Sequence, residues 1–195
     1  MKTTPVYTSF NGNKRIAFGS LKTNALAVKR ALALRPADTV LTFDDQTGNT
    51  VEIDVRGSDA DVIARLAAWQ ETTAEPLPES RGRGRPKLGV VSREITLLPR
   101  HWEWLESQPG GASVTLRKLV EKARKTSAEP DRQRFAQERA YRFMSAIAGN
   151  LPAYEEALRA LFASQEKTFF RHTESWPPDV REYARQLAFG MKETA

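Results

Sequence analysis

The sequence contains no cysteine among its 195 residues, so neither a disulfide framework nor a metal site built from thiolates can form. Long hydrophobic runs are also missing, since no stretch approaches the roughly 20 apolar residues that a membrane-spanning helix needs. The first fifteen residues lack the apolar core of a secretory signal peptide. These absences predict a cytoplasmic protein without membrane contact.

Recognisable catalytic and metal-binding motifs are equally scarce. The two histidines, His101 and His172, lie far apart in the sequence, whereas a zinc site needs three or four ligands. No nucleophile elbow, phosphate-binding loop or dinucleotide fingerprint occurs. We therefore expect a protein that is not an enzyme and that holds neither a metal nor a cofactor.

Positive charge is concentrated in residues 81–125. This stretch holds eleven Lys and Arg side chains against four acidic ones, a balance of +7, whereas the whole chain carries +6. Bases and acids nearly cancel in the rest of the chain. A stretch of this kind is typical of a segment that binds a polyanion.

Residues 1–72 combine strand and helix patterns. The dipeptide Asn11-Gly12 is typical of β-hairpin turns, because both residues tolerate positive φ. Alternating apolar residues predict strands, helical spacing predicts helices, and Ser58 is a suitable helix N-cap. The expected strands cover residues 6–10, 15–18, 39–43 and 50–55, and the expected helices cover 22–34 and 58–70. Two strands, a helix, two strands and a helix predict an α+β fold with a small antiparallel sheet.

The remainder of the chain is expected to form a linker and a helical region. Pro76 and Pro78 favour extended backbone, so we interpret residues 73–92 as a linker rich in proline, glycine and arginine. From residue 93 onward the apolar spacing is helical, and residues 93–195 are expected to be a DNA-binding or interaction domain. Its C-terminal helices are predicted at 131–148, 151–163, 165–171 and from Pro178 onward.

Residues 83–87, Arg-Gly-Arg-Pro-Lys, resemble an AT-hook. Gly84 has no Cβ, so the backbone can lie deep in a narrow groove, and Pro86 keeps the peptide extended. Arg83 and Arg85 would then project along an A·T minor groove, where the negative potential is enhanced. The alternative interpretation is a solvated basic linker. The expected DNA-binding residues here are Arg81, Arg83, Gly84, Arg85, Pro86 and Lys87.

Residues 93–125 resemble a ribbon-helix-helix module, a dimeric DNA-binding fold. Residues 95–97 would form the strand, Pro99 would open the first helix, and Ser113 would cap the second after a glycine turn. The resemblance implies a homodimer whose paired strands enter the major groove. Thr96 would read bases, whereas Glu94 departs from the family pattern because it would repel phosphate. The remaining expected contacts are Arg93, Arg117, Lys118, Lys122 and Lys125. The alternative is a helical hairpin packed on the C-terminal helices, with solvated bases.

Phrases such as RGRGRPKLGVV, EITLLPRHWEWL and SWPPDVREYA resemble, across nearly the full chain, a bacterial family of uncharacterised proteins. That resemblance implies a bacterial source and no particular activity. The basic residues therefore carry the functional expectation, which is a transcriptional regulator or nucleoid-associated factor that binds A·T-rich double-stranded DNA. The alternative is a helical protein-interaction module whose basic linker binds an acidic protein or RNA.

Overall fold

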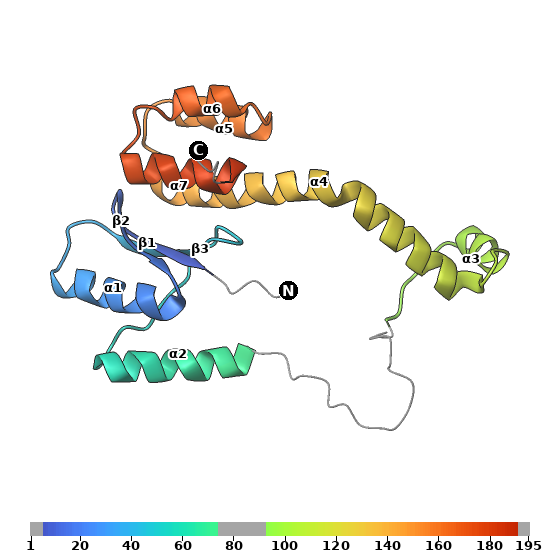
Figure 1. Ribbon diagram of the computed structural model, residues 1–195, viewed down its shortest axis with the longest axis horizontal. Helices are drawn as coiled ribbons and strands as arrows, with labels where there is room; N and C mark the ends of the chain where they lie inside the picture. The colour runs from blue at the N-terminus through green and yellow to red at the C-terminus, as the bar shows by residue number, and fades with distance from the viewer. Residues whose placement is uncertain (1–5, 74–92, 191–195) are drawn as a thin grey trace, which may run out of the picture. The chain divides into compact units, whose positions relative to one another are not determined.

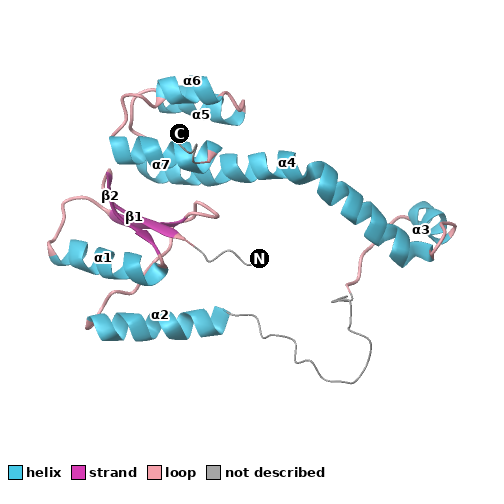
Figure 2. Ribbon diagram, in the orientation of Figure 1, coloured by secondary structure: helices cyan, strands magenta, loops and turns pink. Residues whose placement is uncertain are grey.

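The computed structural model describes residues 6–73 and 93–190, which contain three β-strands and seven helices (Figures 1 and 2). The chain divides into two compact units. Residues 1–74 together with 132–195 form the first, called the sheet unit, and residues 75–131 form the second, called the hairpin unit. The expected α+β class is confirmed.

The sheet is antiparallel and has the strand order β2-β1-β3. Its strands are β1 (Tyr7–Asn11), β2 (Lys14–Gly19) and β3 (Val40–Asp44), which confirms the first three predicted strands. Gly12 adopts a φ of 54° at the hairpin turn, as the Asn11-Gly12 pattern predicted. The register between β1 and β2 shifts after Ser9, so β2 carries a bulge.

The predicted fourth strand at residues 50–55 is wrong. Thr50 makes only an isolated bridge to Phe43, and the backbone then leaves the sheet after Val51 donates to Thr42. Further along this segment the Asp54 side chain accepts the backbone N–H of Arg56 at 3.1 Å, in a local turn. Such a local turn competes with a strand ladder for backbone groups.

One face of the sheet is polar and is covered by α1 (Leu21–Ala33). Ser9 donates to the Asn24 side chain at 2.7 Å and shares a hydrogen bond of 2.8 Å with Thr42. The Asn24 amide in turn donates to the backbone oxygens of Tyr7 and Ser20, both at 3.0 Å. These buried groups satisfy one another, which fixes α1 against the sheet.

The other face is apolar and packs against C-terminal helices, so the sheet lies between two helical layers (Figure 1). Phe10 and Phe43 of the sheet contact Phe143, with ring centroids 5.3 and 5.0 Å away, and Phe143 meets Tyr183 edge to face at 4.7 Å. Aromatic pairs in such geometry stabilise a core beyond the area that they bury. The N-terminal strands and the C-terminal helices therefore share one hydrophobic core.

The C-terminal helices are α5 (Tyr154–Phe162), α6 (Glu166–His172) and α7 (Pro178–Phe189), close to the predicted ranges. A helix predicted to begin near residue 131 is instead part of α4, which runs without interruption from Gly111 to Ile147 with Pro130 inside it. A proline removes one backbone hydrogen bond but does not always end a helix.

The remaining helix of the sheet unit is α2 (Asp59–Thr73), which packs against α1. Ser58 accepts the backbone N–H of Asp61 at 3.2 Å, and Asp61 accepts that of Ser58 at 2.7 Å, so the predicted N-cap is a reciprocal capping box. Val62 of this helix is buried, whereas Trp69 is about half exposed at 48 %.

Candidate nucleic-acid interface

The predicted DNA-binding residues fall into two groups. Arg81, Arg83, Gly84, Arg85, Pro86 and Lys87 lie outside the described residues. The other six, Arg93, Thr96, Arg117, Lys118, Lys122 and Lys125, belong to the hairpin unit and are all exposed.

Residues 93–98, which precede the first helix of the hairpin unit, form no strand in the described chain. Leu98 is extended, with φ −67° and ψ 148°, and serves as the N-cap of α3 (Pro99–Glu106). Leu97 lines an open hollow of the unit, while Thr96 is exposed. Ile95, two residues before Leu97, is 49 % exposed, so the inward and outward alternation of a strand does not extend along this segment.

A short turn joins α3 to α4 and depends on glycine. Gly110 and Gly111 have φ values of 93° and 71°, which lie in the left-handed region that favours glycine. The helix begins at Gly111, so Ser113 lies in its first turn and is not the predicted cap. The glycine turn sets the start of the basic helix.

The N-terminal part of α4 is amphipathic. At about 100° per residue, the bases and the apolar side chains fall on opposite sides of the helix. The basic face consists of Arg117, Lys118, Lys122, Arg124 and Lys125, and the apolar face consists of Leu116, Leu119, Val120 and Ala123. All five bases are exposed, so phosphate oxygens can reach them.

One acidic side chain, Glu121, lowers the positive charge of this basic face. Glu121 lies 3.1 Å from Arg124 and 4.0 Å from Lys125, in ion pairs along the helix. Lys118 and Lys122 make no ion pair with any other residue that the structure describes. Surface pairs of this kind are weak, so a phosphate can replace Glu121 at Arg124 and Lys125.

Sequence reasoning missed the cavity between α3 and α4. It has a volume of about 270 Å³ and is lined by Leu97, His101, Trp104, Leu105, Leu116 and Leu119. Leu105 is the only buried residue of the hairpin unit among those described. The helical spacing of Leu105, Leu116 and Leu119 was visible in the sequence, but the gap left between them was not.

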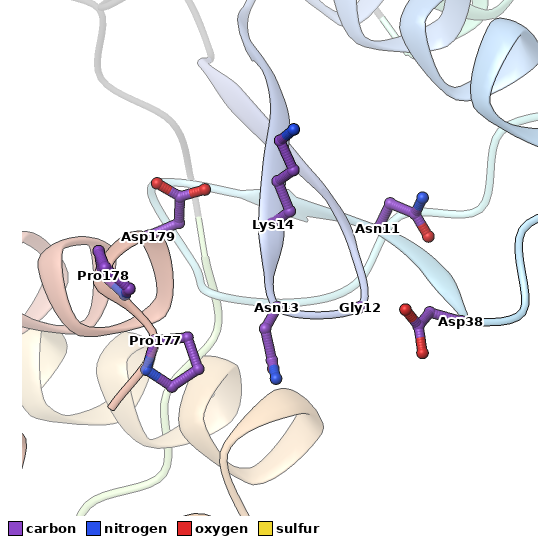
Figure 3. A pocket seen from close by; sticks show the side chains of 8 residues that line it. All are labelled: Asn11, Gly12, Asn13, Lys14, Asp38, Pro177, Pro178 and Asp179. Carbon is purple, nitrogen blue, oxygen red and sulfur yellow. The ribbon is translucent and has the colours of Figure 1, made fainter. Parts of the chain in front are cut away.

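A second hollow lies in the sheet unit, beside the β1–β2 turn (Figure 3). Three separate segments line its volume of about 620 Å³, and they contribute Asn11, Gly12, Asn13, Lys14, Asp38, Pro177, Pro178 and Asp179. Asp179, at the start of α7, accepts the backbone N–H of Arg15 at 2.9 Å and ties that helix to β2. Figure 3 shows Asp38 and Asp179 on opposite sides of the turn, so they do not form a paired acidic site.

Neither metal ligands nor membrane spans were found in the part of the chain that the structure describes. No three His, Asp or Glu side chains gather there in a way that could hold a metal ion. No helix there is both long and apolar enough to cross a bilayer.

The comparisons with known proteins agree with the bacterial resemblance of the sequence. Searches of the curated proteins and of the solved structures found no match. The match to a family model covers residues 6–188, which includes both compact units. The chain therefore belongs to the bacterial family described as "Uncharacterized protein conserved in bacteria (DUF2239)".

Proposed function

We propose that this protein binds double-stranded DNA through its basic segment, residues 81–125, as a transcriptional regulator or nucleoid-associated factor in the bacterial cytoplasm. The observation that carries the proposal is the exposed basic face of α4, which lies opposite the apolar face of the same helix. Opposed faces leave the bases free for phosphate, while Leu116 and Leu119 of the apolar face line the hollow beside α3.

Two parts of the segment have different roles in the proposal. Arg83 and Arg85 enter an A·T-rich minor groove, as the resemblance to an AT-hook implies. Lys118, Lys122 and Lys125 contact phosphates, which position the protein without reading the sequence. Thr96 reads a base edge in this proposal, and its exposure in the hairpin unit is compatible with that role.

The proposal includes two copies of the chain. Residues 95–98 form no strand in a single copy, and pairing with the same segment of a second copy would give their backbone groups hydrogen-bond partners. Two copies also double the number of phosphates contacted by one assembly.

The test is to titrate the protein into A·T-rich and G·C-rich duplexes at several salt concentrations. Fluorescence anisotropy of the duplex measures binding. About four to six phosphate contacts per chain give a slope of log affinity against log salt near −4 to −5 for each chain bound, and about twice that for a dimer that binds as one assembly. Arg83→Ala with Arg85→Ala should reduce the slope by about two units and abolish the A·T preference. Lys122→Ala with Lys125→Ala should lower the affinity for both duplexes by the same factor.

A matched control removes two exposed bases outside the basic segment. Lys167→Ala with Arg171→Ala changes the net charge by the same amount, and both positions lie on α6 of the sheet unit. This variant should bind both duplexes nearly as tightly as the wild type. A wild-type salt slope near zero would instead favour the interaction-module alternative, in which the basic segment meets an acidic protein or RNA.

A further inference from the structure

The hairpin unit has too little core to hold its own fold. Among residues 93–131, only Leu105 is buried. Small domains of this size are marginal because they bury too little surface on folding, and an additional partner or crosslink usually stabilises them. The chain has no cysteine to supply a disulfide.

The apolar side chains that would form such a core lie instead on the surface of the hairpin unit. Five large ones are about half exposed: Ile95 at 49 %, Leu98 at 49 %, Trp104 at 50 %, Leu119 at 44 % and Val120 at 63 %. Exposed apolar groups concentrated on one small element mark an interaction surface. Trp104 and Leu119 also line the 270 Å³ cavity, so the exposed surface continues into a hollow.

This surface combines exposed apolar side chains with a hollow beside them. Ile95 and Leu98 belong to the extended segment before α3, while the cavity lies between that segment, α3 and α4. A patch with both features can fit a second copy of itself across a two-fold axis. The bases of α4 lie on its other side, so two apolar patches can meet without bringing two basic faces together.

We infer that a second copy of the chain covers this patch, with residues 95–98 of each copy packing over the cavity of the other. This inference rests on the two-copy part of the proposed function and names the surface that joins the copies. It adds a helical contact to strand pairing, because Leu119 and Val120 of α4 take part.

The area available matches what a dimer needs. Five half-exposed large side chains present on the order of 400 Å² of apolar surface per copy. Interfaces are about 57 % non-polar, so that apolar surface corresponds to about 700 Å² buried per copy. A standard stable interface buries about 800 Å² per partner, and the cavity walls supply part of the remainder.

The test is the mass of the full chain by sedimentation equilibrium, from about 1 to 100 µM, a range chosen around typical dimer affinities. The wild type should have the mass of two chains, and Leu119→Glu should raise the dimer dissociation constant at least tenfold. Leu34→Glu is the matched control, because Leu34 is 84 % exposed and lies at the end of α1 in the sheet unit. That variant should dimerise like the wild type.

Leu119 is exposed in the single copy, so its replacement should leave the sheet unit folded, which circular dichroism and the thermal midpoint check. Val120→Glu, at a position that does not line the cavity, should weaken the dimer as well. A monomeric wild type at tens of micromolar, or a Leu119→Glu dimer as tight as the wild type, would overturn the inference.

Dimerisation and DNA binding are measured separately, so their failures can be told apart. A monomer whose affinity for duplex DNA still falls steeply with salt would contradict the interface and support the DNA-binding proposal. A dimer that shows no salt-dependent duplex binding would support the interface and contradict the DNA-binding proposal.

Discussion

The hydroxyl of Tyr183 donates a hydrogen bond of 2.6 Å to the Asp45 carboxylate, which joins α7 to the turn after β3. Thr8 of β1 donates to the same carboxylate at 2.9 Å. Burial raises the pKa of Asp45 above its usual value, although the hydrogen bonds from Tyr183 and Thr8 oppose the shift. Burial and the bond to Asp45 likewise raise the pKa of Tyr183.

Removing the Tyr183 hydroxyl should destabilise the sheet unit while leaving its aromatic packing in place. Tyr183→Phe keeps the ring contacts with Phe143 and Phe10 but withdraws one donor from a half-buried carboxylate. A hydrogen bond to a charged group contributes about 1.5 to 3 kcal/mol, and urea denaturation should show a loss of that order. Tyr154→Phe is the control, because its hydroxyl shares an exposed bond with Ser145 and should change stability by less than about 0.5 kcal/mol.

The raised pKa of Asp45 gives a stability effect with a defined sign. A carboxyl whose folded pKa exceeds its unfolded value of 3.8 binds protons more tightly in the folded state. Its contribution to stability is therefore highest below pH 3.8 and is lost as the pH rises through the folded pKa. The side chain of the Asp45→Asn variant stays neutral at every pH, so it loses no stability through this ionisation. The free energy of unfolding of the wild type should therefore fall relative to that of the variant as pH increases.

The measurement is urea denaturation of both proteins from pH 3.5 to pH 7. Exposed acids such as Asp59 and Glu174 have lowered pKa values and contribute stability that is lost as pH falls, which masks Asp45 in the wild type alone. Subtracting the stability–pH curve of the variant from that of the wild type cancels the contributions of those groups, because both proteins contain them. A stability difference that does not change with pH would contradict this account of Asp45.

Gly48 should be intolerant of a side chain. Its φ is 71°, and a Cβ placed there would lie 2.2 Å from the backbone oxygen of Arg139 in α4. A left-handed conformation costs an L-residue about 1 to 2 kcal/mol, and the backbone clash adds to that. Gly48→Ala should thus lower stability by about 3 kcal/mol or more, as the shift in the urea midpoint measures.

The Gly190→Ala variant separates the two causes of the loss expected at Gly48, which are backbone strain and the clash with Arg139. Gly190 also has a positive φ, of 81°, but a Cβ there meets nothing within 4 Å. Gly190 has a ψ of 169°, in a region that essentially only glycine adopts, so backbone strain alone would make Gly190→Ala lose at least as much stability as Gly48→Ala. We expect the larger loss at Gly48.

Neutralising Glu121 should strengthen duplex binding if the basic face of α4 contacts DNA. Glu121→Gln removes one negative charge and releases Arg124 and Lys125 from their ion pairs. A surface pair contributes at most about 1 kcal/mol, so the affinity at about 0.1 M salt should rise two- to fivefold. Glu155→Gln, an equal change at an exposed position of α5, should have little effect, and equal gains from both variants would argue against a specific role for α4.

The sequence alone determined the elements whose hydrogen bonds and packing are local. The Asn11-Gly12 turn, the apolar spacing of α1 and the Ser58 cap each lie within one or two turns of chain, and the structure contains all three. Residues 50–55 show the limit of such reasoning, since they were predicted to be a strand but pair with β3 only at Thr50 and Val51.

The tertiary structure decided how distant segments meet. Apolar spacing showed that Phe143 and Tyr183 face inward, but not that they share a core with Phe10 and Phe43 of the sheet. Periodicity specifies a face of an element and carries no information about its partner. It also did not show that α4 continues through Pro130, because retaining a proline within a helix depends on the packing on either side of it.

The candidate site divides in the same way. Net charge is additive along a chain, so the basic character of residues 81–125 was readable directly from the sequence. Whether those bases are exposed, which of them Glu121 pairs with, and where the α3–α4 cavity opens depend on the directions in which side chains leave folded helices. Those directions follow from helix start points and packing, and only the folded chain sets them.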